Sequence, residues 1–145
     1  MVGTVLVING PNLNLLGERD PNVYGTATLA DVEALCRAEA ALLGLSVEFF
    51  QSNHEGALID KIHEVRRSAS GVVANLGAYT HTSIAIMDAL DVLTVPIVEV
   101  HLSDIHAREE FRRHSYISLV ADKVIVGKGI EGYALALRHI AEVLS

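Results

Sequence analysis

The segment Thr4-Val-Leu-Val-Ile-Asn-Gly-Pro-Asn-Leu-Asn-Leu-Leu-Gly17 changes within two residues from an apolar run to an asparagine-rich stretch. The β-branched residues before Gly10-Pro11 predict a buried strand over residues 4–9. No helical periodicity follows before Ala27, so we expect a long polar loop, and loops of this length in compact domains are usually functional or mobile. Two interpretations stay open: an active-site lid, or an ordinary turn fixed by its asparagine side chains.

The alternation of short apolar strands and helical patterns continues along the chain. Thr28 and Asp31 have capping-box spacing and begin a helix that Gly44 ends. Repeated strand–helix units predict an α/β fold with a doubly wound, five-stranded parallel sheet and helices on both faces. No linker or repeat interrupts the pattern, so we expect residues 1–145 to form a single domain. Further strands are predicted at residues 45–50, 71–76, 96–100 and 124–126, and further helices at residues 58–65, 83–90 and 133–144.

Composition restricts the class of protein and its partners. The formal charge is −7, with 11 Lys+Arg against 18 Asp+Glu, which argues against a general nucleic-acid binder because such a protein needs a basic face. The apolar runs are too short to span a membrane, and the first four residues show no basic signal-peptide region. A single cysteine, Cys36, fits a reducing compartment, so we expect a cytoplasmic protein. One local basic spot is predicted within residues 101–114, from Arg108, Arg112, Arg113, His101, His106 and His114.

Polar residues are concentrated in the segments that follow the predicted strands. Residues 10–24, 51–56, 75–83 and 101–114 are rich in Asn, His, Arg and Ser, whereas the loops at the other ends of the strands are short and plain. In open parallel sheets, ligands bind outside the carboxyl ends of the strands. The asymmetry therefore predicts an active site at that edge.

Several motifs can be explained by a structural role as well as by a functional one. Gly127-Lys-Gly-Ile-Glu-Gly132 matches a dinucleotide-binding pattern, but no strand with an acidic ribose ligand follows it, so close strand–helix packing by glycine is favoured. No zinc pattern occurs, and Cys36 is expected to be a buried structural thiol. Alternation places Glu99 and His101 on the same side of a strand, where they form either a carboxylate–imidazole pair or an ordinary strand-end ion pair.

Six segments, in register, resemble type II 3-dehydroquinate dehydratase. One position departs from the family pattern: Leu76 stands where a proline or small residue is usual, between matching neighbours. The six segments are Ile8–Gly17, Arg19-x-Pro-x-x-Tyr24-Gly25, Gln51-Ser-Asn-His-Glu-Gly56, Asn75-x-Gly-Ala-Tyr-Thr-His-Thr-Ser83, Glu99-Val-His-x-Ser103 and Arg108-Glu-Glu-Phe-Arg-Arg-His-Ser115.

The resemblance implies a flavodoxin-like fold, assembly into a homododecamer (a tetramer of trimers) and reversible anti-dehydration of 3-dehydroquinate to 3-dehydroshikimate, without metal or cofactor. This reaction belongs to the shikimate pathway of aromatic amino-acid biosynthesis and to quinate catabolism. Tyr24 matches the base and His101 the acid, and Glu99 matches the partner of that acid. Arg19 matches the residue that activates the tyrosine, and Asn12 the residue that holds a water at the enolate. The implied substrate-binding set is Asn75, His81, Asp88 (across a trimer interface), Leu102, Ser103, Arg108 and Arg112.

A non-catalytic, flavodoxin-like small-molecule-binding module is the alternative. A receiver domain needs clustered acids after the first strand, and a flavin-binding module needs a Ser/Thr-rich phosphate loop; residues 9–16 offer neither. Such a module would leave the four polar segments unexplained. We therefore expect an enzyme.

Overall fold

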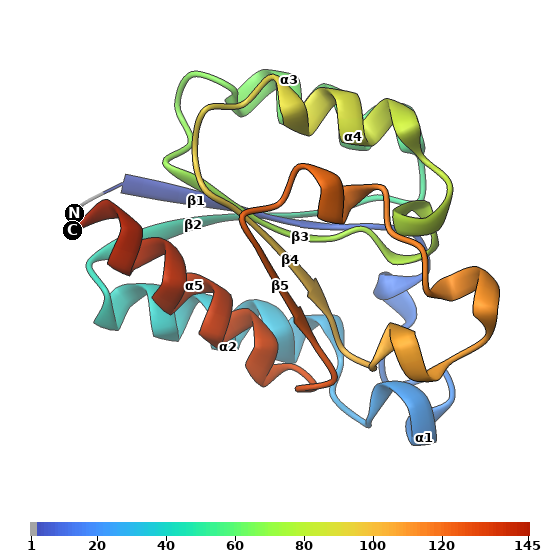
Figure 1. The fold of residues 1–145 in the computed structure, drawn as a ribbon. Coiled ribbons are helices and arrows are strands. Elements are labelled where there is room, and N and C mark those ends of the chain that lie inside the picture. The colour runs from blue at the N-terminus through green and yellow to red at the C-terminus, as the bar shows by residue number, and fades with distance from the viewer. Residues whose placement is uncertain (1–2) are drawn as a thin grey trace.

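The computed structural model describes residues 3–145; Met1 and Val2, on which the signal-peptide expectation partly rests, lie outside the described residues. Within them, five parallel strands form one sheet with the order β2-β1-β3-β4-β5 (Figure 1). This is the flavodoxin-like order, with its topological switch point between β1 and β3. The predicted α/β fold with a doubly wound sheet is confirmed. The strands are β1 (Gly3–Asn9), β2 (Leu45–Gln51), β3 (Gly71–Asn75), β4 (Ile97–His101) and β5 (Lys123–Val126).

Helices cover both faces of the sheet, as predicted (Figure 1). The central strands β1, β3 and β4 read as mostly apolar runs because their successive side chains point to opposite faces that are both buried, whereas the edge strands β2 and β5 are only partly buried. On β1, Val5 and Val7 pack toward α2 (Leu29–Leu42) and α5 (Glu131–Leu144). Leu6 and Ile8 pack toward α3 (Glu55–Val65) and α4 (Ile84–Asp91).

Local capping explains where two of these helices begin. Thr28 Oγ1 accepts from Asp31 N at 3.2 Å, and Asp31 Oδ2 accepts from Thr28 N at 2.9 Å, which confirms the capping box of α2. Ser83 caps α4 by accepting from Ile86 N at 2.9 Å. Helix α3 begins at Glu55, three residues before its apolar periodicity does, because a first turn need not face the core.

Residues 10–27 differ from the prediction of one long loop. They contain a 3₁₀ turn, Leu13–Leu15, and a one-turn helix, α1 (Pro21–Tyr24). Asp20 caps α1 by accepting from Asn22 N at 3.0 Å, and proline at the first helical position suits a turn too short to show periodicity. Leu13 and Leu16 are buried in the core, so the segment is anchored at one end. Other 3₁₀ turns lie at Gly77–His81, Ile105–Ala107, Glu110–Arg112 and Ile117–Leu119.

The glycines after β5 pack a helix onto the sheet, as favoured from sequence. A Cβ on Gly132 would lie 3.2 Å from Val100 Cγ1 and 3.4 Å from Ile125 Cγ2. Cys36 is a buried thiol in α2, and burial raises its pKa to about 12, which fits a structural role. None of the helices within residues 3–145 has the length and apolarity needed to cross a membrane.

Candidate active site

A cavity of about 130 Å³ opens beyond the carboxyl ends of β1, β3 and β4. All of the predicted site residues line it except Glu99 and Asp88. Pro11, Leu13, Gly77, Ala78 and Ile105 complete the wall and were not predicted individually, although all but Ile105 lie within segments quoted for the resemblance. The lining residues predicted from sequence are Asn12, Arg19, Tyr24, Asn75, His81, His101, Leu102, Ser103, Arg108 and Arg112.

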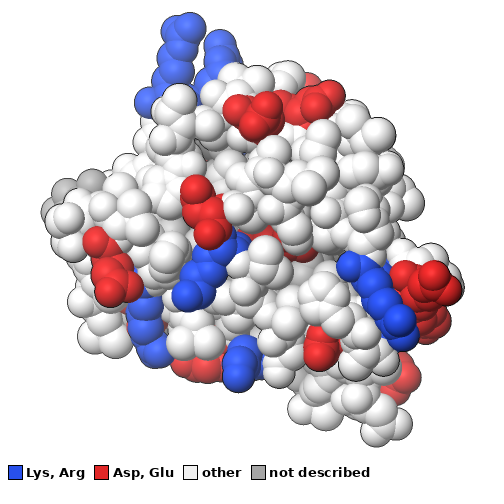
Figure 2. Space-filling view, viewed as in Figure 1, with Lys and Arg blue, Asp and Glu red and all other residues white. Residues whose placement is uncertain are grey.

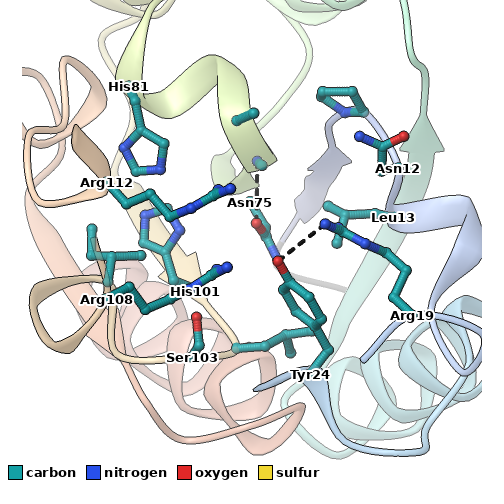
Figure 3. Close-up of a pocket in the computed structure, with 15 residues that line it drawn as sticks. Asn12, Leu13, Arg19, Tyr24, Asn75, His81, His101, Ser103, Arg108 and Arg112 are labelled. Atoms are coloured by element: carbon teal, nitrogen blue, oxygen red, sulfur yellow. Dashed lines mark hydrogen bonds between the residues drawn. The ribbon is translucent and has the colours of Figure 1, made fainter. Parts of the chain in front are cut away.

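Tyr24 and Arg19 form one wall of the cavity (Figure 3). Arg19 Nη2 donates to Tyr24 Oη at 3.1 Å, and its guanidinium carbon lies 4.3 Å from the centre of the phenol ring. A second guanidinium carbon, that of Arg108, lies 5.3 Å from the same ring centre. Cations so close stabilise the phenolate form of a tyrosine electrostatically. The one-turn helix α1 places Tyr24 there, five residues after Arg19.

His101 and Glu99 form a buried pair at the end of β4. His101 Nε2 lies 2.5 Å from Glu99 Oε2. Ser115 Oγ donates to the same carboxylate at 2.7 Å, and Ser118 Oγ donates at 2.5 Å. Burial opposes the ionisation of Glu99, but the hydrogen bond and charge of His101 and the two serine hydroxyls outweigh it and hold the Glu99 pKa below its ordinary value. The predicted contact between Glu99 and His101 is confirmed, and the carboxylate lies behind the imidazole.

His81 presents a defined nitrogen to the cavity. Its Nδ1 lies 2.7 Å from the carbonyl oxygen of His114, and because a carbonyl only accepts, Nδ1 must carry the hydrogen. Partial burial lowers the pKa of His81, aided by the charges of His101 and Arg112 and opposed by the bond to His114 and the charge of Glu99. The neutral ring is therefore favoured, and Nε2 is an acceptor. The rings of His81 and His101 stack with centres 6.5 Å apart.

The predicted basic spot is brought together only in part. Arg108, Arg112 and His101 line the cavity, whereas Arg113, His106 and His114 do not. Arg112 Nε donates to Glu109 at 2.5 Å, which holds the guanidinium on its short turn. On the face shown in Figure 2, lysine and arginine side chains are scattered, some of them beside acidic ones, and they form no continuous basic surface.

Two backbone turns complete the floor. Asn12 adopts φ 69°, in the left-handed region that asparagine tolerates, and its backbone N–H donates to Asn53 Oδ1 at 2.9 Å. The turn at Leu102 and Ser103 is fixed through its carbonyl oxygens, which accept from Gly129 N at 3.1 Å and Gly127 N at 3.2 Å. Asp88 is exposed on α4 and does not line the cavity.

Asn75 is held from beneath by residues that the sequence did not single out. Asn75 Nδ2 donates to Tyr133 Oη at 2.9 Å, and that hydroxyl donates to Asn9 Oδ1 at 2.7 Å. Apolar periodicity marked Tyr133 only as a core position of the last helix, as it does for any buried tyrosine. Ser115 lies in a quoted segment, but nothing local connects it or Ser118 with Glu99.

Within residues 3–145, no group of three His, Cys, Asp or Glu side chains is arranged to hold a metal ion. The arrangement instead pairs a cation-flanked phenol with a carboxylate-backed imidazole across one small cavity, in an α/β sheet of the flavodoxin-like order. These features define an enzyme site suited to proton transfer at two positions of a small anionic ligand.

The chain belongs to the family of class II dehydroquinases, whose model (Dehydroquinase class II) matches residues 3–141. It is 62% identical over 143 residues to the 3-dehydroquinate dehydratase of Methylobacterium radiotolerans, covering 99% of this chain and 96% of that protein. It is 55% identical to the catabolic 3-dehydroquinase of Aspergillus oryzae, covering 95% and 90%. The crystal structure of type II dehydroquinase from Butyrivibrio crossotus matches with a TM-score of 0.93 and 44% identity, covering 95% of this chain and 97% of that one.

Proposed function

We propose that this chain dehydrates 3-dehydroquinate to 3-dehydroshikimate in the cavity at the end of β4, as a hydro-lyase. The observation that carries the proposal is the placement of the Tyr24–Arg19 pair and of His101 on opposite walls of one cavity (Figure 3). An anti elimination needs its base and its acid on opposite faces of the ring. The family membership favours this reaction over a non-catalytic binding module.

The first step is removal of a proton from the carbon next to the ketone. Tyr24, as phenolate, takes this proton, and the Arg19 guanidinium at 3.1 Å stabilises the phenolate before the step. Electron density moves onto the ketone oxygen, which becomes an enolate. Asn12, on the neighbouring wall, holds a water against that oxygen. Fixed donors of this kind stabilise developing charge at little reorganisation cost.

The second step expels the hydroxyl group as water. His101, as imidazolium, gives its proton to the leaving oxygen; the C–O bond breaks and the enolate electrons form the carbon–carbon double bond. Nε2 faces Glu99, so Nδ1 is the nitrogen that serves the substrate. Glu99 stabilises the imidazolium and holds its ring in place, as a buried carboxylate does in other acid–base pairs.

The remaining lining residues bind the substrate. Asn75, His81 and Arg112 contact its hydroxyl groups, and the turn at Leu102 and Ser103 takes its carboxylate, with Arg108 nearby. Arginines in the cavity explain how a chain of charge −7 attracts an anion. None of the described residues that line the cavity is a lysine, so we expect no Schiff base and no inactivation by borohydride in the presence of substrate.

The test is a continuous ultraviolet assay with 3-dehydroquinate and chelator-treated protein, following the conjugated enone of the product. Robust turnover that falls by about 10²–10⁴ in Tyr24→Phe supports the reaction and the site together. Absence of turnover by folded, assembled protein would overturn the proposed function.

We further propose that residues 1–145 act as one catalytic domain, that twelve copies assemble as a tetramer of trimers, and that the enzyme works in the cytoplasm. The exposure of Asp88 on α4, outside the cavity of its own chain, suits a residue that acts across a subunit boundary. The single buried thiol suits a reducing compartment. Light scattering should give about twelve times the 15.6 kDa chain mass, and a monomeric active enzyme would contradict the assembly.

A further inference from the structure

A series of hydrogen bonds, partly buried at Phe50 and buried from Asn9 onward, runs from β2 at the edge of the sheet to the cavity. Asn9 Nδ2 donates to the carbonyl oxygen of Phe50 on β2 at 3.1 Å. Asn9 Oδ1 accepts from the Tyr133 hydroxyl at 2.7 Å, and Tyr133 Oη accepts from Asn75 Nδ2 at 2.9 Å. Asn9 and Tyr133 are fully buried and Asn75 nearly so, so water cannot readily replace a lost partner.

The Phe50 carbonyl determines which group donates and which accepts in each of these hydrogen bonds. The Phe50 carbonyl can only accept, so Asn9 must direct its NH₂ group toward it and its oxygen toward Tyr133. Tyr133 must then donate to Asn9 and accept from Asn75. Burial raises the pKa of the Tyr133 hydroxyl, which therefore keeps the proton that this arrangement requires.

These hydrogen bonds determine how the side-chain amide of Asn75 is oriented at the cavity. With its NH₂ group committed to Tyr133, the amide oxygen lies on the side of Gly77, whose N–H it accepts at a long 3.4 Å (Figure 3). A carbonyl oxygen has two lone pairs, so this contact leaves capacity for a hydroxyl donor from the substrate. A side-chain amide without such a restraint could rotate by half a turn and present NH₂ instead.

We propose that Tyr133 is a positioning residue that orients the Asn75 amide, so that Asn75 accepts a hydrogen bond from a substrate hydroxyl group. Tyr133 comes from α5, lies outside the cavity lining and never meets the substrate. This inference rests on the proposed substrate-binding role of Asn75. In this proposal, α5 contributes to substrate binding as well as to the hydrophobic core.

The test is Tyr133→Phe, which removes one oxygen and keeps the ring. We expect kcat/KM for 3-dehydroquinate to fall about tenfold, the order of one lost hydrogen bond. Because Asn75 would bind the hydroxyl in the ground state and in the transition state alike, the fall should come mainly through KM. In an Asn75→Ala background, Tyr133→Phe should cause little further loss, since both changes remove the same interaction.

Ile140→Val is the control for a loss of core stability. Ile140 is fully buried on the same helix and lies outside the hydrogen-bond chain. This variant should lower the denaturation midpoint and leave KM unchanged. Kinetic constants equal to those of the parent in folded Tyr133→Phe, or additive losses with Asn75→Ala, would overturn the proposal.

Asn9→Ala tests the polarity itself and substitutes for Tyr133→Phe if that variant does not fold. It leaves Tyr133 free to donate to Asn75, which favours the flipped amide, so KM should rise in the same way; an unchanged KM would contradict the proposal. Turnover by the parent chain is measured first. A parent that does not convert 3-dehydroquinate refutes the proposed function, whereas an active parent with insensitive variants refutes only the role of Tyr133.

Discussion

Replacing Glu99 by glutamine removes one charge from behind the acid and almost no volume. All three partners of the carboxylate donate to it: His101 Nε2 at 2.5 Å, Ser115 Oγ at 2.7 Å and Ser118 Oγ at 2.5 Å. A glutamine can turn its NH₂ group toward Ser118, whose hydroxyl rotates to accept, and keep its oxygen toward His101. The geometry of the acid is therefore retained while the charge is lost.

The magnitude follows from the distance. An N···O separation of 2.5 Å puts the two charge centres about 4 Å apart, where unit charges attract by ~4 kcal/mol at an effective dielectric of 20. The neutral amide keeps a hydrogen bond of about 1 kcal/mol. The imidazolium thus loses about 3 kcal/mol, or roughly a 10²-fold fall in kcat at ~1.36 kcal/mol per tenfold.

The assay is enone formation from 3-dehydroquinate as a function of pH, with unfolding monitored in parallel. Glu33→Gln is the matched control, since it removes the same charge from an exposed ion pair with Arg37 on α2. A Glu99→Gln enzyme whose kcat stays within about threefold of the parent would refute the assigned role of the carboxylate.

Three further predictions concern the base and the response to acid. Tyr24→Phe should lower kcat by about 10²–10⁴ with the fold intact by circular dichroism; near-normal turnover would exclude Tyr24 as the base. Arg19→Ala removes the cation 3.1 Å from the phenolic oxygen, so kcat should fall with the fold intact; an unchanged kcat would mean that Arg108 alone stabilises the phenolate. The lowered pKa of Glu99 contributes stability that is present above the unfolded value and lost as pH falls through the folded one. Denaturant unfolding between about pH 6 and pH 2 should therefore show the parent losing stability more steeply than Glu99→Gln, and parallel curves would contradict this.

Local patterns in the sequence predict the strands, the helices and the edge of the sheet at which the cavity lies. Apolar alternation, the Thr28–Asp31 box and the glycine stops are local signals, so they predicted the strands and helices to within a few residues. The one-turn helix at Pro21–Tyr24 was missed because four residues carry no period. Spacing along β4 was enough to place Glu99 beside His101, because alternation puts residues two apart on one face.

The distant groups that support the site are not encoded in any local pattern, because they meet only when the layers pack together. Tyr133 meets Asn75 across 58 residues and Asn9 across 124, and it does so because β1 lies beside β3 with α5 packed beneath them. Ser115 and Ser118 likewise reach Glu99 through the path of the chain after β4. Periodicity indicates which face of a helix is buried, because residues three or four apart in the sequence lie on the same face. It does not record what is packed against that face, because the partner depends on the strand order and on the stacking of whole layers.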